Sequence, residues 1–310
     1  MPLISVVMPC YNEEENVVEA CRQVREVFQR LPEYEYEHIF IDNCSADRTV
    51  DLIREIAAKD KRVKAIVNSR NFGHIRSPYH AYLQVGGDVL ISLASDLQDP
   101  VHLIYDFVKK WEEGYMIVVG VKDKGIESYM MSVIRSAYYS VISRLSEIEQ
   151  IRHFTGFGLY DKKVIDIIRS FNDPYPYFRG LITEIGFERA EIKFTKPSRT
   201  HGITKNNFYT LYDIAMLGIT NHSKVPLRIA AMLGFALSIL SLMVALGYFI
   251  AKLMMWHTFS MGMAPLIIGL FFFSSVQLFF VGILGEYIGT IHTQVMKRPL
   301  VVEKERINFD

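Results

Sequence analysis

Four clusters of polar residues, each directly after a short apolar run, carry most of the chemistry open to this chain. They read PCYNEEE, DNCSADRT, NSRNFGH and SDLQDP. Their carboxylates, amides and hydroxyls can bind a polar ligand, and carboxylates can also hold a hard divalent cation. None contains GxGxxG or GxxxxGK[ST], and the nine histidines lack HxxxH or HExxH spacing. A dinucleotide site, a P-loop and a zinc site are therefore not favoured.

The apolar runs before these clusters are typical of buried parallel strands, and amphipathic segments alternate with them. This order predicts an α/β domain with a mostly parallel, doubly wound sheet. Ligands bind at the carboxyl ends of such strands, so the four clusters are predicted to converge on one site. The predicted strands are Ile4–Met8, His38–Asp42, Val63–Asn68, Val89–Leu93 and Met116–Val121, and the predicted helices are Glu14–Gln29, Ala46–Lys59, Ile75–Gln84 and Pro100–Glu113.

Two long uncharged runs follow this domain. A helix crosses the apolar core of a membrane with roughly 20 residues, so we predict transmembrane helices over about 229–251 and 264–286. A helical hairpin buried in a soluble protein is the alternative. Because basic residues flank the pair and the turn between carries only Lys252, the positive-inside rule places both ends in the cytoplasm. The flanking residues are Lys224, Arg228, Lys297, Arg298, Lys304 and Arg306.

The predicted organisation is a cytoplasmic domain over 1–222, the hairpin within 223–291 and a cytoplasmic tail over 292–310. The segment Tyr129–Leu145 is amphipathic, which suits either the membrane interface or an ordinary core-facing helix. Gly282, Gly285 and Gly289 have the spacing of close helix contacts, so a homo-oligomer is one interpretation and glycine tolerated in lipid the other.

The composition limits the class of partner and the compartment. The 310 residues carry no net charge, which gives no basis for a nucleic-acid partner. The mean hydropathy of +0.15 is high for a soluble protein. Three cysteines without a CxxC pair are typical of free thiols in a reducing compartment, and the segment MPLISVVMPC lacks the features of a signal peptide. We therefore expect a multi-pass protein of the inner or plasma membrane.

The order and spacing of several motifs resemble those of the family 2 glycosyltransferases with a GT-A nucleotide-sugar-binding fold. Within that family the chain is similar to the polyprenyl-phosphate glycosyltransferases. The resemblance implies an enzyme that transfers a hexose from UDP-glucose to undecaprenyl phosphate, with inversion and a divalent metal ion. It rests on SVVMPCYNEEENV, IDNCSADRT, RNFGH, SDLQDP, FRGLITEIGF, SRTHGITKNNFYTLYDIAMLGIT and KVPLRIA.

The resemblance also implies a set of nucleotide-binding residues. The pair Asp42 and Asn43 matches residues that contact the base and ribose, although Asp42 could instead cap the following helix. Arg70 could pair with a phosphate or with a nearby carboxylate. The full set is Pro9, Tyr11, Asn12, Glu13, Asp42, Asn43 and Arg70.

The metal site implied by the resemblance consists of Asp96 and Gln98. Both offer the oxygen ligands that Mg²⁺ and Mn²⁺ prefer. The family's first aspartate is replaced by Ala94, which leaves one carboxylate fewer. We expect Asp99, before Pro100, to cap the next helix and not to bind the metal.

Basic residues are needed to hold an anionic acceptor beside an anionic donor. The residues that match basic positions of the family, or lie near the expected lipid, are Lys122, Arg135, Arg179, Arg199 and Lys205. A basic surface facing lipid headgroups is the alternative for several of them. A further carboxylate of the family is replaced by Gly156. If that carboxylate served as a general base, its loss is tolerable here, because a phosphate acceptor is already anionic near neutral pH and needs no deprotonation.

Other activities remain open from the sequence. The sugar could be mannose from GDP-mannose, 4-amino-arabinose or an N-acetylhexosamine, moved to the same lipid. The missing carboxylates at Ala94 and Gly156 also fit a non-catalytic scaffold that binds a nucleotide sugar or a lipid.

Overall fold

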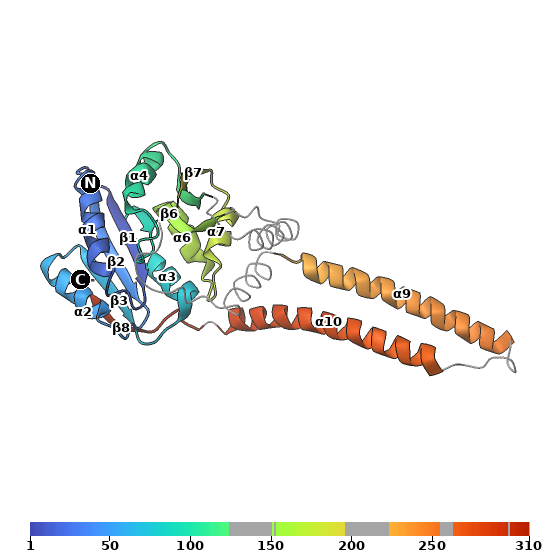
Figure 1. Ribbon diagram of the computed structural model, residues 1–310. Helices are drawn as coiled ribbons and strands as arrows, with labels where there is room; N and C mark the ends of the chain where they lie inside the picture. The colour runs from blue at the N-terminus through green and yellow to red at the C-terminus, as the bar shows by residue number, and fades with distance from the viewer. Residues whose placement is uncertain (124–150, 152, 196–222, 255–262, 297, 310) are drawn as a thin grey trace.

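An eight-stranded mixed sheet forms the centre of the domain, with strand order β7-β5-β6-β4-β1-β2-β3-β8 (Figure 1). The computed structural model describes residues 1–123, 151, 153–195, 223–254, 263–296 and 298–309. Four adjacent strands, β4-β1-β2-β3, are parallel, whereas β6 and β8 each pair antiparallel with their neighbours. The strands are β1 (Leu3–Cys10), β2 (Glu35–Asp42), β3 (Val63–Asn68), β4 (Val89–Ser92), β5 (Ile117–Lys122), β6 (Phe154–Asp161), β7 (Arg189–Phe194) and β8 (Glu303–Ile307).

Helices cover both faces of this sheet. One face packs against α1 (Val17–Phe28), α2 (Thr49–Lys59) and α4 (Ile104–Glu112), and the other against α3 (Gly73–Gln84), α6 (Lys162–Phe171) and α7 (Phe178–Glu184). A short 3-10 helix, η1 (Val101–Leu103), precedes α4. The predicted α/β fold with a mostly parallel sheet is confirmed.

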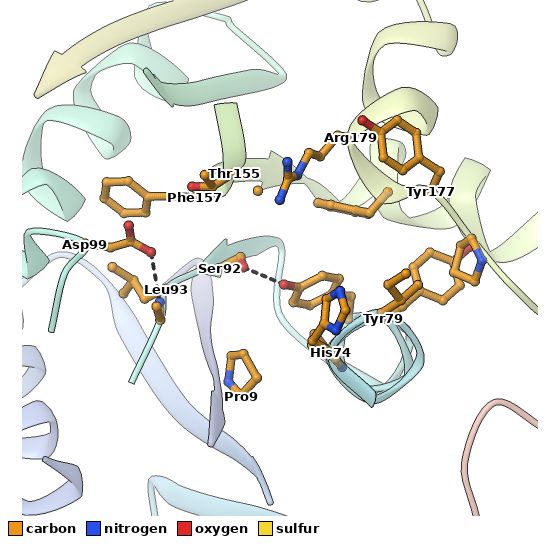
Figure 2. Close-up of a pocket in the computed structure, with 17 residues that line it drawn as sticks. Pro9, His74, Tyr79, Ser92, Leu93, Asp99, Thr155, Phe157, Tyr177 and Arg179 are labelled. Atoms are coloured by element: carbon orange, nitrogen blue, oxygen red, sulfur yellow. Dashed lines mark hydrogen bonds between the residues drawn. The ribbon is translucent and has the colours of Figure 1, made fainter. Parts of the chain in front are cut away.

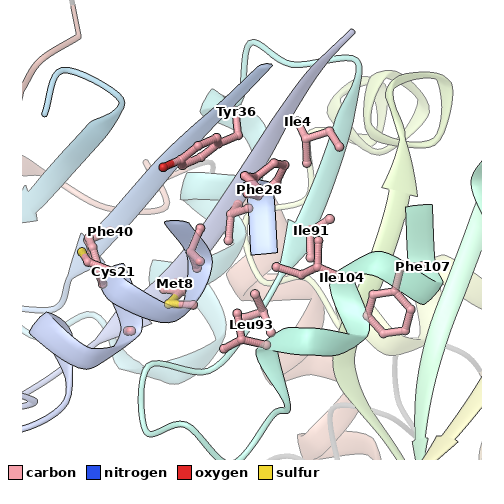
Figure 3. Close-up of a cluster of buried hydrophobic side chains, with 14 of the residues drawn as sticks. Ile4, Met8, Cys21, Phe28, Tyr36, Phe40, Ile91, Leu93, Ile104 and Phe107 are labelled. Carbon is pink, nitrogen blue, oxygen red and sulfur yellow. The ribbon is translucent and has the colours of Figure 1, made fainter. Parts of the chain in front are cut away.

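The two-sided burial explains the apolar runs in the sequence. In β1 the side chains of Ile4, Val6 and Met8 enter the cluster on the α1 side, and Val7 enters the cluster on the α3 side. Figure 3 shows the first cluster, in which Phe28 and Tyr36 stack with their ring centroids 4.2 Å apart. Strands buried on both faces lose the alternation of polar and apolar residues and read as continuous apolar segments.

Two long helices project from the domain (Figure 1). They are α9 (Val225–Met254) and α10 (Met263–Val295), and both extend beyond the predicted 229–251 and 264–286. Segments of each are long and apolar enough to cross a membrane, Val225–Ala251 and Gly269–Val295. Large apolar side chains on both helices are exposed, for example Phe235 at 73% and Phe271 at 70%. Exposed apolar surface on this scale requires an apolar partner.

After α10 the chain returns to the domain and forms β8 within the segment predicted as a tail. This strand pairs antiparallel with β3, with Glu303 opposite Asn68. Side chains of β8 contact both neighbouring helices. Glu305 forms an ion pair with Arg54 of α2, and Glu303 contacts His80 of α3, at 2.6 Å each. The domain is thus joined to the helical hairpin at both ends of the hairpin.

Candidate active site

The carboxyl ends of the parallel strands carry loops that are tied to one another by side-chain hydrogen bonds. Asn12, after β1, accepts from the backbone N–H of Ala46 at 2.8 Å, and its own N–H donates to the Ser45 hydroxyl at 2.8 Å. Asn12 adopts a left-handed conformation with φ 55°, which asparagine tolerates better than most residues. The Glu13 N–H donates to the Thr49 hydroxyl at 2.8 Å. The loops after β1 and β2 therefore form one interlocked unit.

Asp42 ends β2 and is fully buried. Its carboxylate accepts from the backbone N–H of Ser45 at 2.9 Å and from the Ser45 hydroxyl. Burial raises the pKa of this carboxyl group, while the bonds from Ser45 act in the opposite direction. The carboxylate holds the turn after β2 in the structure, and a nucleotide base would have to compete with Ser45 for it.

The side chain of Asn43 is also used within the protein. Its amide group donates to Asn71 Oδ1 at 2.9 Å and to the carbonyl of Gly73 at 3.2 Å. Its carbonyl oxygen accepts from the Phe72 N–H at 2.8 Å and from Asn68 Nδ2 at 3.3 Å. With both amide hydrogens and both lone pairs engaged, Asn43 joins the end of β2 to the loop before α3.

Arg70 lies in that same loop and is exposed. Its guanidinium carbon lies 4.0 Å from the centroid of the Phe72 ring, and one nitrogen donates to the carbonyl of Asn71 at 3.1 Å. Arg70 is not among the residues that line the pocket described below.

The loop after β4 contains the predicted metal ligands. Asp96 Oδ1 accepts from the Gln98 N–H at 3.2 Å, and Leu97 between them has φ 58°. Ser95 donates to the carbonyl of Pro9 at 2.8 Å, which fixes this loop against the end of β1. Pro100, and not Asp99 as predicted, occupies the N-cap position of the helical segment that follows. The Asp99 carboxylate accepts from the Ala94 N–H at 3.0 Å and closes the loop.

The described residues contain no group of three or more His, Cys, Asp or Glu side chains that could hold a metal ion. Asp96 and Gln98 nevertheless offer hard oxygen donors two residues apart on one tight turn. Mg²⁺ in nucleotide sites is commonly held by one or two carboxylates together with phosphate oxygens and water. The residues present therefore fit a cation that takes most of its ligands from a bound diphosphate.

A pocket of about 250 Å³ opens beside this loop, between α3 and α7 and over the ends of β1, β4 and β6. Figure 2 shows Arg179 and Tyr177 on the α7 side and His74 and Tyr79 on the α3 side. The Tyr82 hydroxyl and the Ser92 hydroxyl lie 2.7 Å apart in its floor. The lining residues are Pro9, His74, Ile75, Pro78, Tyr79, Tyr82, Ser92, Leu93, Ala94, Asp99, Thr155, Gly156, Phe157, Pro176, Tyr177, Phe178 and Arg179.

The pocket lining holds a basic and an acidic side chain, Arg179 and Asp99. His74, opposite Arg179, has a pKa lowered first by burial and then by the charge of Arg179. Burial raises the pKa of Tyr82 to about 12, so its hydroxyl stays protonated and can donate. Sequence analysis did not single out His74 or Tyr82; the motif RNFGH contains His74, but nothing local marks it as a pocket residue.

Gly156, the position at which the resemblance implies a missing carboxylate, lines the pocket. It has φ 101°, a conformation that side chains rarely adopt, and its carbonyl accepts from the Tyr160 hydroxyl at 2.8 Å. The local backbone is thus built for glycine.

The predicted site residues do not all converge on this pocket. Pro9 and Arg179 line it. Tyr11, Asn12, Glu13, Asp42, Asn43, Arg70, Asp96 and Gln98 lie in the loops at the same edge of the sheet without lining it. Lys122 ends β5 at this edge, and its backbone N–H donates to the carbonyl of His153 at 3.3 Å. Arg135, Arg199 and Lys205, and the segment Tyr129–Leu145, lie outside the described residues.

The helical hairpin meets the domain at this same edge. Gln294 of α10 donates to the carboxylate of Asp173 at 2.8 Å, in the loop that leads to Pro176 and Tyr177 of the pocket. The Tyr287 hydroxyl donates to the carbonyl of Ser223, just before α9, at 2.7 Å. The pocket and the base of the hairpin are therefore neighbours.

Comparisons with known proteins place these features in context. The sequence profile of "Glycosyl transferase family 2" matches residues 5–171. The glycosyltransferase YkcC of Bacillus subtilis is 32% identical over 308 residues, which cover 99% of this chain and 94% of that protein. The SfII prophage-derived bactoprenol glucosyl transferase of Shigella flexneri is 29% identical over 303 residues, or 97% of each chain. Among solved structures, mannosyl-3-phosphoglycerate synthase from Rubrobacter xylanophilus superposes with a TM-score of 0.48 at 12% identity, covering 75% of each chain.

Proposed function

Because the chain belongs to glycosyl transferase family 2 and is a glycosyltransferase, we propose that it transfers a sugar from a nucleotide to a polyprenyl phosphate at the cytoplasmic face of a membrane. The proposed donor is UDP-glucose and the proposed acceptor is undecaprenyl phosphate. The bactoprenol glucosyl transferases of Shigella and its phages, which match nearly the whole chain, support this choice of reaction.

One structural observation carries the proposal: the pocket opens where the hairpin joins the domain. The hydrogen bond between Gln294 and Asp173 connects the end of α10 to the loop that forms one wall of the pocket. If α9 and α10 span the membrane, the phosphate of a lipid anchored in the bilayer lies at the height of the pocket. A soluble acceptor would require no such arrangement.

The nucleotide is proposed to bind in the interlocked loops after β1 and β2. Tyr11 is proposed to pack on the base, and Pro9 and Glu13 flank Tyr11 in the sequence. The side chains of Asn12, Asp42 and Asn43 form hydrogen bonds within the protein. Their proposed contribution is therefore partly to hold the shape of this loop unit.

The proposed chemistry is a single displacement at the anomeric carbon. A phosphate oxygen of the lipid forms the new bond to that carbon, while the bond to the nucleoside diphosphate breaks and its electron pair leaves with the diphosphate. The attacking face is opposite the leaving group, so the configuration inverts. A phosphate monoester has a second pKa near 6, so its oxygen needs positioning and not deprotonation. This fits glycine at position 156.

Cationic groups are proposed to hold the acceptor phosphate and the departing diphosphate. Arg179 in the pocket can bind a phosphate with two parallel hydrogen bonds. The Tyr82 hydroxyl and His74 supply further polar contacts from α3. Lys122 at the same edge, and Arg135, Arg199 and Lys205 outside the described residues, complete the proposed set.

Asp96 and Gln98 are proposed to hold a divalent cation, Mg²⁺ or Mn²⁺. When bound, such an ion neutralises charge that develops on the leaving diphosphate. In this turn Asp96 Oδ1 accepts from the Gln98 N–H, which holds the two residues next to each other.

A panel of donors tests the proposal. Radiolabelled UDP-glucose, UDP-galactose, UDP-GlcNAc and GDP-mannose are each given to the full chain in detergent with undecaprenyl phosphate and Mg²⁺ or Mn²⁺. Label from UDP-glucose should enter organic solvent, and EDTA should abolish the transfer. Transfer from another donor would correct the sugar. The panel also includes the nucleotide sugar of 4-amino-arabinose. If the protein binds nucleotide but transfers sugar from none of these donors, it is a non-catalytic scaffold and not the enzyme proposed here.

A further inference from the structure

Two arginines pack against one aromatic ring at the start of α3. The guanidinium carbon of Arg70 lies 4.0 Å from the centroid of Phe72, and that of Arg76 lies 5.6 Å from it. The two like charges are therefore held close together, although they repel each other.

A third arginine joins them from the segment after α10. Arg76 donates to the carbonyl of Pro299 at 2.5 Å, which brings the adjacent Arg298 to the same place. Loss of water around Arg76, and then the charges of Arg70 and Arg298, lower the pKa of Arg76. We call Arg70, Arg76 and Arg298 the arginine cluster.

The arginine cluster has no acidic counterpart in the part of the chain that the structure describes. Elsewhere Arg54, Arg62 and Arg306 each pair with a carboxylate within 2.8 Å. No such ion pair involves a member of the cluster, and Arg76 Nε is buried without a hydrogen-bond partner among the described residues. A buried, unmatched donor on a charged group is costly unless a ligand satisfies it.

The cluster lies next to the end of α10, whose segment Gly269–Val295 is long and apolar enough to cross a membrane. Arg298 is three residues beyond Val295, the last residue of α10, and is exposed together with Arg70. Arginine binds phosphate oxygens with two parallel hydrogen bonds, and basic residues near a bilayer attract anionic headgroups.

We propose that Arg70, Arg76 and Arg298 bind the phosphate of an anionic phospholipid, at a site beside the pocket and separate from sugar transfer. For Arg70 this role replaces the nucleotide-binding role that the resemblance implies. The inference rests on the proposed function only in taking α9 and α10 as membrane-spanning. Three cations without carboxylates, the buried and unpartnered Nε atom of Arg76, and a position directly after α10 fit a phosphodiester headgroup at the membrane surface. Bound lipid would fix the domain at a set height and angle on the bilayer.

Native mass spectrometry of the full chain in detergent tests this proposal. The protein is titrated with phosphatidylglycerol or with phosphatidylcholine of the same acyl chains. The wild type should bind phosphatidylglycerol more tightly, and the double variant Arg76→Gln/Arg298→Gln should weaken that binding by about tenfold or more. The matched control is Arg22→Gln/Arg30→Gln, which removes two exposed arginines at α1, on the opposite face of the sheet.

The possible outcomes distinguish the proposed phospholipid site from the site of sugar transfer. Unchanged binding in the Arg76/Arg298 variant, or equal loss in the control, would overturn the proposal. Displacement of the bound lipid by inorganic phosphate, or binding of undecaprenyl phosphate in preference to phosphatidylglycerol, would overturn the assignment to a bilayer phospholipid. Sugar transfer is measured in parallel with neutral lipid alone. Selective phosphatidylglycerol binding without any transfer would defeat the proposed function and leave the arginine cluster as a lipid site.

Discussion

The carboxylate of Asp173 accepts a hydrogen bond from the side-chain amide of Gln294 at 2.8 Å. The same oxygen accepts from the Tyr175 N–H at 2.9 Å and so shapes the loop between α6 and α7. Pro176 and Tyr177, the next residues along, line the pocket. The position of one pocket wall is thus coupled to the last turn of α10.

Replacing Gln294 by alanine should impair use of the lipid acceptor more than use of the donor. The variant loses the hydrogen bond to Asp173, which holds α10 in position against the pocket wall. We expect the KM for the lipid to rise by about threefold to tenfold with a smaller change in kcat, since one hydrogen bond to a carboxylate is lost. Kinetics with each substrate varied in turn give the two values. Thr293→Ala, which removes only a hydrogen bond within α10, is the control. An equal rise of the donor KM in the Gln294 variant would contradict the coupling.

Asp96→Asn should abolish most of the transfer while leaving the fold intact. The amide oxygen can still accept from the Gln98 N–H, so the turn is kept, but the only carboxylate proposed for the metal is gone. We expect the rate to fall by about two orders of magnitude, and more Mn²⁺ to be needed for what remains. Initial rates over a range of Mn²⁺ concentrations and thermal unfolding check this. Asp106→Asn, an exposed carboxylate on α4, is the matched control; wild-type rates in the Asp96 variant would remove the metal assignment.

Restoring a carboxylate at position 156 should not improve the enzyme. A Cβ atom there would meet nothing closer than Phe178 at 3.9 Å, so the cost of a side chain comes from φ 101° and not from crowding. Both Gly156→Ala and Gly156→Asp should lose about 1–3 kcal/mol of stability, with similar falls in the unfolding temperature. Transfer by the aspartate variant should not exceed that of the alanine variant. A clear gain with aspartate alone would show that the reaction benefits from a general base.

Stability should fall as the solution is acidified below about pH 6.5 because of His38. Burial lowers the pKa of this histidine from 6.5 to about 3, and Nε2 has no hydrogen-bond partner among the described residues. The native protein keeps the ring neutral, whereas the unfolded chain takes up a proton as the pH drops through 6.5. Each pH unit between 6.5 and 3 therefore costs up to about 1.4 kcal/mol. Unfolding temperatures of the wild type and His38→Leu at pH 7.5 and 5.5 measure the effect; parallel shifts in both would exclude His38 as the cause.

The strands β1 to β5 could be predicted because each contains a short apolar run. The strands β6 and β7 were not among the predicted strands. The strand β8 was missed because it lies at an edge and carries charges on successive residues, Glu303 to Arg306. Charged edge strands resist pairing with other molecules, and the same charges hide the strand in a sequence.

The candidate site was predicted less completely than the fold. Asn43 stood out as a polar residue after β2, but its partners Asn71 and Phe72 come from the loop after the next strand. Whether a polar side chain faces a ligand or holds a loop is decided by such distant partners, which local sequence does not encode. His74 and Tyr82 became pocket residues only through the packing of α3 against α7.

The return of the chain to form β8 also sets an order of events during synthesis. The residues that pair with β3 are made only after both long helices, so the backbone N–H and C=O groups along the edge of β3 stay open until then. A chain whose hairpin is delayed or misplaced would present that open edge to other nascent chains. Completion of the sheet and correct placement of α9 and α10 are therefore linked steps of biogenesis, and misplaced helices would lead to aggregation through the open edge of β3.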